Sequence, residues 1–130
     1  MEDFDIAPSK IGESAQRVVD RAMEEARRRD HAQVTNEHVF LAFAQVEWDT
    51  FSQVMTELDL NPHDIVHALE GYLDSLRKTS VRDLRVAPAT KLVLKLAFHQ
   101  ASRGGRQTIE SGDLFSAIFE ESQGIPVAII

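Results

Sequence analysis

The histidines His63 and His67 have the spacing of metal ligands, because residues four apart lie on one face of a helix. The segment between them, His-Asp-Ile-Val-His, lacks the glutamate of the zinc-peptidase motif H-E-x-x-H. Zinc sites also need at least three protein ligands, and the pattern supplies two. We therefore predict surface histidines and no metal site, and a metal bound by this pair stays the alternative.

Motifs for catalysis are absent from the sequence. None of the six glycines is followed by lysine, so the phosphate-binding loop G-x-x-x-x-G-K-[ST] is missing. No serine lies in a G-x-S-x-G turn. The sequence has no cysteine, which excludes a thiol nucleophile and disulfides. We predict that the chain is not an enzyme, has no catalytic residues and binds no cofactor. ATP hydrolysis, if any, would belong to another part of a longer chain or to another protein.

A second set of polar residues suits binding. Thr35 has the character of a helix N-cap, with its hydroxyl turned to a free backbone N–H. Glu37 then lies in the first helical turn, where its carboxylate either serves the helix dipole or contacts a partner. We expect Thr35 and Asn36 to be exposed and to add hydrogen bonds. Lys91 and His99 are two turns apart on another predicted helix. They form either a solvated basic stripe or a docking surface.

The charge of the chain is unevenly distributed. The net charge is −7, with −8 in residues 1–78 and +1 in residues 79–130. An acidic first half disfavours nucleic acid, whose affinity for proteins depends on Lys and Arg, and it favours a basic or neutral protein partner. No apolar run is long enough to cross a bilayer, and the acidic N-terminus fits neither a secretory signal nor a transit peptide. With no cysteine, we expect a cytoplasmic protein.

One segment occurs twice with a shift of 75 residues. Residues 14–43 align without a gap on residues 89–118 and share six identities. Three of them are Val18 with Val93, Ala22 with Ala97 and Ala26 with Ala101, at four-residue spacing on one helical stripe. Self-similarity at a fixed period indicates a repeat architecture. We expect the two segments to superpose by a pseudo-twofold rotation.

The periodicity of apolar residues predicts an all-α fold with no strand. We expect helices near 13–29, 35–46, 62–77, 88–103 and 111–121, and a short one that begins after a break at Trp48-Asp49. Residues 1–11 should be a loose lead-in, and residues 79–87 a linker. The layout is a single domain over 1–130, with repeat one at about 12–78 and a partial repeat two at 88–130. The second repeat would lack its C-terminal third and its fourth helix.

These motifs resemble the N-terminal Clp repeat domain of Clp-family AAA+ unfoldases. The resemblance rests on A-Q-x-V-x-x-x-A-x-x-x-A from Ala15, followed by Thr35-Asn36-Glu37-His38 and an apolar run. The second half is similar to the ClpA branch in residues 93–99 and 117–119. The resemblance covers about residues 11–130. It implies an all-helical double repeat that receives adaptors and substrates for an ATP-driven ring.

The resemblance also implies site residues. In ClpA-like domains the adaptor ClpS docks at positions that match Glu37 and His99, with a basic residue at the position of Lys91. In ClpC-like domains a threonine at the start of the first helix and the glutamate of T-E-H bind phosphorylated arginine. This chain has Gly12 and Ala87 at the threonine positions and Gly112 at the second glutamate, which argues against that activity.

The sequence therefore predicts an adaptor- and substrate-docking N-domain of a Clp unfoldase. The expected partner-binding residues are Thr35, Asn36, Glu37, Lys91 and His99. We expect a ClpS-like adaptor and protein substrates as partners, no nucleic acid, no membrane, and a monomeric isolated domain. The alternative is a free-standing accessory subunit that braces or regulates a Clp complex.

Overall fold

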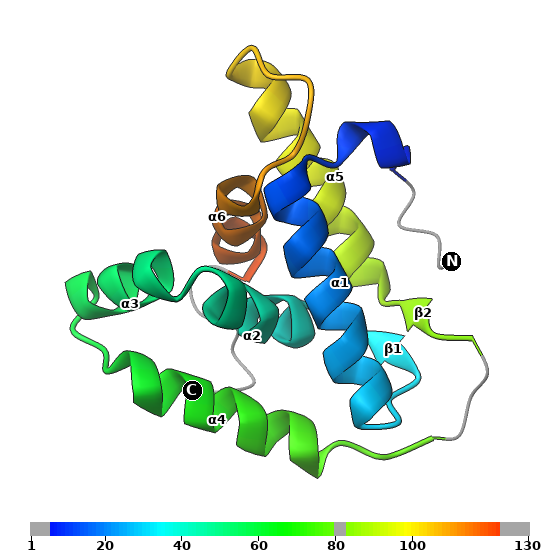
Figure 1. The fold of residues 1–130 in the computed structure, drawn as a ribbon, viewed down its shortest axis with the longest axis vertical. Helices are drawn as coiled ribbons and strands as arrows, with labels where there is room; N and C mark the ends of the chain where they lie inside the picture. The colour runs from blue at the N-terminus through cyan, green and yellow to red at the C-terminus, as the bar shows by residue number, and fades with distance from the viewer. Residues whose placement is uncertain (1–5, 80–82, 123–130) are drawn as a thin grey trace.

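A computed structural model describes residues 6–79 and 83–122, and its fold is built from helices (Figure 1). The elements in chain order are η1 (Pro8–Lys10), α1 (Glu13–Arg28), β1 (Gln33–Val34), α2 (Asn36–Val46), α3 (Trp48–Glu57), α4 (Pro62–Ser75), β2 (Arg85–Val86), α5 (Pro88–Arg103) and α6 (Ser111–Ser122). The predicted all-α class is confirmed, and the five predicted helix ranges agree with these bounds to within two residues.

The structure corrects three details of the prediction. The break after α2 is at Glu47, which ends α2 and precedes α3, so Trp48 already belongs to α3. The lead-in contains the 3-10 helix η1, and the linker contains β2, which pairs in parallel with β1. Strands of two residues are too short to show an alternating pattern, which is why neither strand was predicted. The expected end of repeat two lies outside the described residues.

The element bounds follow the 75-residue shift. Moving α1 by 75 residues gives the bounds of α5, and α2 moves in the same way onto α6 to within one residue. The backbone pairings follow the shift as well, because Val34 pairs with Val86 and Ile11 pairs with Ile109. The shift carries Ile11 to position 86 and Val34 to position 109, so it exchanges one pairing for the other. These correspondences support a duplicated unit, while the pseudo-twofold superposition itself stays a prediction.

The turns after α1 and α5 have the same construction. Asp30 and Gly105, which the shift relates, both adopt positive φ angles, of 56° and 79°. His31 N–H donates to the Ala26 carbonyl at 2.9 Å, and Arg106 N–H donates to the Ala101 carbonyl at 2.9 Å. A left-handed residue with such a bond is a common way to end a helix. Both repeats therefore leave their first helix in the same direction.

Helix α2 is the centre of the molecule. It contacts α1, α3, α4, α5 and α6, and in Figure 1 it lies between α1 and the arm formed by α3 and α4. A helix that is apolar on most of its circumference must be buried in this way. Phe40 is fully buried, with ring centroids 5.6 Å from Phe51, 5.5 Å from Phe115 and 5.9 Å from Phe119. The aromatic cluster joins the two repeats into one core.

Candidate functional site

The start of α2 is fixed by Thr35 and His38. The Thr35 backbone N–H donates to Nδ1 of His38 at 2.9 Å, and the Thr35 hydroxyl lies 2.8 Å from the same nitrogen. Together the two residues form a capping box, in which the third helical residue returns a hydrogen bond to the N-cap. The prediction of Thr35 as the N-cap is confirmed. The backbone entering α2 therefore has one orientation.

Behind this cap lies a buried histidine pair that the sequence did not reveal. Nδ1 of His31 is 2.9 Å from Nε2 of His38, and these residues are 5% and 0% exposed. Since Nδ1 of His38 accepts from Thr35, its proton is on Nε2 and is donated to His31. Burial, followed by the neighbouring His31 and Arg29, lowers the pKa of His38 to about 4. The pair is therefore neutral near pH 7.

The second repeat builds the same cap from charged residues. By the 75-residue shift His31 corresponds to Arg106 and His38 to Asp113, and these two are joined by two bonds of 2.7 Å. Asp113 also accepts the Glu110 backbone N–H at 2.8 Å, as His38 accepts that of Thr35. Burial raises the pKa of Asp113, but Arg106 and the Glu110 N–H outweigh burial and lower it. The two repeats thus share a geometry and differ in its chemistry.

Thr35 and Asn36 differ from the exposed pair that we expected, since Thr35 is half-buried and Asn36 is buried. Asn36 is only 7% exposed, and its Nδ2 donates to Oε2 of Glu121 on α6 at 3.3 Å. The expectation that Asn36 is exposed is therefore wrong, because α6 covers the first residue of α2. Glu37 is half-buried, and burial and then the Glu37 charge raise the pKa of Tyr72 on α4. Glu37 thus acts electrostatically on α4.

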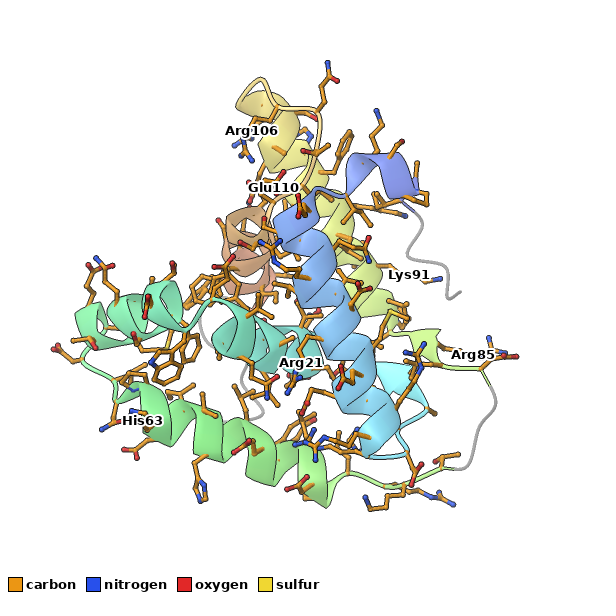
Figure 2. All side chains as sticks on the ribbon, in the orientation of Figure 1. Arg21, His63, Arg85, Lys91, Arg106 and Glu110 are labelled. Carbon is orange, nitrogen blue, oxygen red and sulfur yellow. The ribbon has the colours of Figure 1, made fainter. Side chains whose placement is uncertain are left out.

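The strand pair sets the place of Lys91 relative to these residues. Because β1 and β2 are parallel and end at Val34 and Val86, α2 and α5 begin beside each other. Lys91 is in the first turn of α5, is half-buried, and lies on the outer side of the helix (Figure 2). His99 is exposed and lies eight residues further along, about 12 Å up the helix axis. Lys91 is therefore near the start of α2, and His99 is two turns away.

The other end, where α1 and α6 begin, is closed by Glu110 (Figure 2). Its carboxylate accepts from the Ser14 hydroxyl at 2.6 Å and from Thr108 at 3.0 Å, and the Ser14 bond lowers its pKa. Gly12 leaves the space for this carboxylate, because a Cβ there would clash with Oε2 of Glu110. The end of the molecule at which α1 and α6 begin is thus filled by a side chain of the protein itself.

Comparison with known proteins identifies the family. The sequence profile of the Clp repeat (R) N-terminal domain matches residues 10–129. The chain belongs to the Clp repeat N-terminal domain family. A search of curated protein sequences gives no significant match.

Solved structures of Clp N-terminal domains have the same fold. The Hsp104 N-terminal domain from Candida albicans gives a TM-score of 0.75 at 14% identity, over 92% of this chain and 86% of that one. The N-terminal domain of the ClpV1 ATPase from E. coli EAEC gives 0.72 at 24% identity, over 88% and 71%. That of ClpD from Arabidopsis thaliana gives 0.71 at 17% identity, over 95% and 86%. At these identities the likeness shows the fold alone.

In this Clp repeat domain the two candidate metal ligands have separate surroundings. The ring of His63 packs against Trp48 with centroids 4.9 Å apart, and His67 lines a pocket between α1 and α4. Within residues 6–79 and 83–122, no group of three or more His, Cys, Asp or Glu side chains is placed to hold a metal ion. In the same part of the chain, no helix has the length and apolar character needed to span a bilayer.

Proposed function

We propose that this domain is a docking module of a Clp unfoldase, which binds adaptor and substrate proteins and performs no catalysis. Clp N-terminal domains are non-catalytic modules of AAA+ proteins. A structure that matches this chain at 24% identity and a TM-score of 0.71 is named for a peptide from the EAEC T6SS Sci1 SciI protein. That likeness supports a segment of a protein as the kind of partner. The absence of cysteine fits a cytoplasmic setting.

The proposed surface consists of Thr35, Asn36, Glu37, Lys91 and His99 and is called the α2–α5 surface below. The observation that carries the proposal is the pairing of β1 with β2, which puts the starts of α2 and α5 side by side. Glu37 and Lys91 then offer one negative and one positive group at the same end of the molecule. Asn36 is the weakest member, since it is buried and already bonded to Glu121.

The partner that fits best is a ClpS-like adaptor with a basic or neutral contact face. The first half of the chain carries −8 and would attract such a face over about a Debye length, roughly 8 Å at physiological salt. Rim charges of this kind act mainly on the rate of association and on its salt dependence. We therefore expect the affinity to fall as salt rises.

Alanine substitutions test the α2–α5 surface. We expect Glu37→Ala and His99→Ala each to weaken adaptor binding by about 1–2 kcal/mol, the range of moderately important contact residues. Thermal stability should change little, because His99 is exposed and Glu37 is half-buried. The measurement is calorimetric titration of a ClpS-type adaptor at low and moderate salt. Glu57→Ala, which removes an exposed carboxylate at the end of α3, is the matched control.

Unaltered affinity in both variants would contradict the α2–α5 surface and move the docking site elsewhere. An equal loss of folding stability would show that Glu37 and His99 are structural. A loss with Glu57→Ala of the same size would show that only the overall negative charge matters.

The position of Glu110 at the start of α1 argues against phosphorylated arginine as the ligand. A phosphate placed beside the α1 start would meet the Glu110 carboxylate, which lies against Gly12. The negative phosphate and the negative carboxylate would repel each other. Docking of unmodified protein partners is the function that we retain.

A second expectation separates the docking module from other classes of protein. The purified chain should neither hydrolyse ATP nor bind nucleic acid at physiological salt, because it lacks a phosphate-binding loop and carries a net charge of −7. Phosphate release and the fluorescence anisotropy of a labelled oligonucleotide measure the two activities. Hydrolysis by a preparation free of chaperones and nucleases would overturn the docking module. Capture of a complete Clp ring from the native lysate by a chain that has no ATPase region of its own would favour the accessory subunit.

A further inference from the structure

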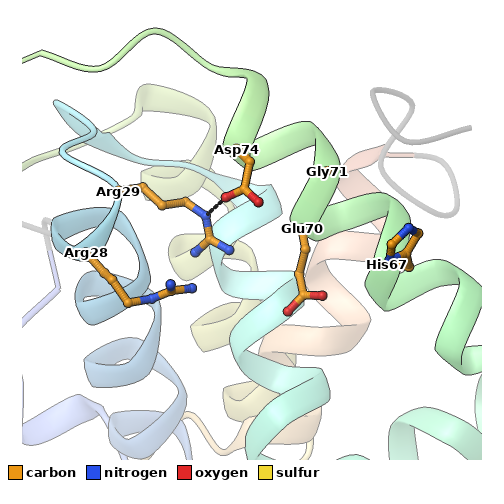
Figure 3. A pocket seen from close by; sticks show the side chains of 6 residues that line it. All are labelled: Arg28, Arg29, His67, Glu70, Gly71 and Asp74. Atoms are coloured by element: carbon orange, nitrogen blue, oxygen red, sulfur yellow. Dashed lines mark hydrogen bonds and ion pairs between the residues drawn. The ribbon is translucent and has the colours of Figure 1, made fainter.

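A pocket of about 310 Å³ lies between the C-terminal end of α1 and α4. Its lining residues are Arg28, Arg29, His67, Glu70, Gly71 and Asp74. Figure 3 shows the guanidinium groups of Arg28 and Arg29 on one side and the carboxylate of Glu70 opposite them. Ligand pockets in proteins span roughly 300–1,000 Å³, so this one has room for a single side chain and not for a large cofactor.

The arginines of the pocket already have acidic partners. Arg29 is only 3% exposed; its Nε donates to Asp74 at 2.8 Å and its Nη1 to Glu25. Arg28 donates to the same Glu25 carboxylate at 3.0 Å, and Glu25 is 1% exposed. Both guanidinium groups are therefore held by carboxylates of the protein.

Glu70 is the one carboxylate of the pocket with no such partner. Within the described part of the chain no side chain makes a hydrogen bond or ion pair with it, although two arginines line the same pocket. The charged lining residues balance, with Glu70 and Asp74 against Arg28 and Arg29, and Glu25 behind the arginines also pairs with Arg21 at 3.4 Å. The unpaired carboxylate is on the side of α4 that faces the pocket.

The surroundings of the pocket are acidic. Residues 30–76, which include α2, α3 and α4, contain nine Asp and Glu residues and no Lys or Arg. The pocket itself is lined by both signs of charge, and basic residues at 27–29 and 77–78 flank this stretch, so the acidic surroundings favour a basic guest only through longer-range attraction. An acidic guest would meet Glu70 and Asp74 and would have to displace an existing pair. A basic guest meets the unpaired Glu70.

Gly71 keeps the α4 wall of the pocket open. It lies in the interior of α4, where glycine is less favourable than alanine because it loses more conformational freedom. Nothing packs against it that would explain the glycine, since a Cβ built there meets no atom within 4 Å. Its φ angle is not in the left-handed region either. Gly71 lines the pocket, and the space beside its Cα is open.

We propose that this pocket binds one basic side chain, arginine or lysine, from a segment of a protein partner, with Glu70 as its acceptor. Asp74 adds a second carboxylate, whose Oδ1 is held by Arg29. The pocket shares no residue with the α2–α5 surface. Each of the two sites can therefore fail its test without affecting the other.

The test is an NMR titration of the isotopically labelled chain with acetyl-Gly-Arg-Gly-amide. The amide signals of residues 67–74 should shift, and the peptide should bind about fivefold more tightly than its citrulline analogue, which has the same shape without the charge. Glu70→Gln should remove this preference. Glu57→Gln, an exposed carboxylate on α3 outside the pocket, should leave it unchanged.

Two substitutions of Gly71 separate binding from folding. Gly71→Ala should raise the melting temperature by about 2–5 °C through better helix propensity. Gly71→Leu should fill the pocket and abolish the shifts, with the helical circular dichroism retained. Shifts produced equally by acetyl-Gly-Glu-Gly-amide, an unchanged affinity in Glu70→Gln, or no shift of residues 67–74 at any attainable peptide concentration would each overturn the proposal.

Discussion

Replacing Phe40 with alanine should lower the free energy of unfolding by about 3–5 kcal/mol, the usual cost of emptying a large aromatic site in a core. Phe40 is fully buried on α2, the helix that contacts all the other α-helices. Its ring packs between Phe51 from repeat one and Phe115 from repeat two, so no single neighbour can move to fill the space. The loss should therefore approach the upper end of the range.

Urea unfolding followed by circular dichroism measures this change. Leu92→Ala is the control, since it removes a large apolar side chain that is 57% exposed on α5, and it should change stability by less than about 0.5 kcal/mol. Phe115→Ala, at the equivalent position, should be nearly as damaging, because its ring stacks on Phe43 at 4.2 Å. A loss below 1 kcal/mol for Phe40→Ala would mean that the two repeats do not depend on a common aromatic core.

The helices of this fold were predictable because their signals are local and repeated. Apolar residues at three- and four-residue spacing located α1, α2, α5 and α6, and the 75-residue shift fixed their correspondence. The strand pair was not predictable, since two residues carry no period, and its partners are far apart in sequence. Its effect is nevertheless large, because it decides which helix starts are neighbours.

The paired caps show what a comparison of identities misses. His31 and His38 in one repeat become Arg106 and Asp113 in the other, so the shift finds no identity at either position. What the repeats share is a pair of hydrogen-bonded side chains, one of which also accepts a hydrogen bond from the N-cap backbone.

The candidate site was predicted in part. The sequence correctly put Thr35 at an N-cap, but it could not show that α6 covers Asn36. The pocket of Glu70 was not predicted at all, because it joins the end of α1 to α4, about 45 residues later in the chain. Contacts between helices of this separation depend on packing angles that no local pattern specifies.

His38 makes the stability of the domain depend on pH between about 4 and 6.5. Burial, then His31 and Arg29, lower its pKa from 6.5 to about 4 in the folded chain, against a smaller opposing effect of Glu25. In the unfolded chain the imidazole returns to its ordinary value. The unfolded state therefore binds more protons in this window, so the free energy of unfolding falls as the pH falls. Protonation would also turn Nδ1 from an acceptor into a donor and break the bond from the Thr35 N–H.

Between pH 7 and pH 5 we expect the free energy of unfolding to fall by about 2 kcal/mol, and by about 3 kcal/mol over the whole window. The lowered carboxyl pKa values of Glu25, Glu110 and Asp113 act only at lower pH, near and below their ordinary values of 4.5, 4.5 and 3.8. Urea unfolding at a series of pH values measures the slope. His38→Asn should flatten it, because the amide oxygen can still accept the Thr35 N–H but does not titrate, whereas His99→Asn changes an exposed histidine and should not. A slope that survives in His38→Asn would show that His38 is not its source and would leave His31, whose pKa burial also lowers, as the other titrating member of the pair.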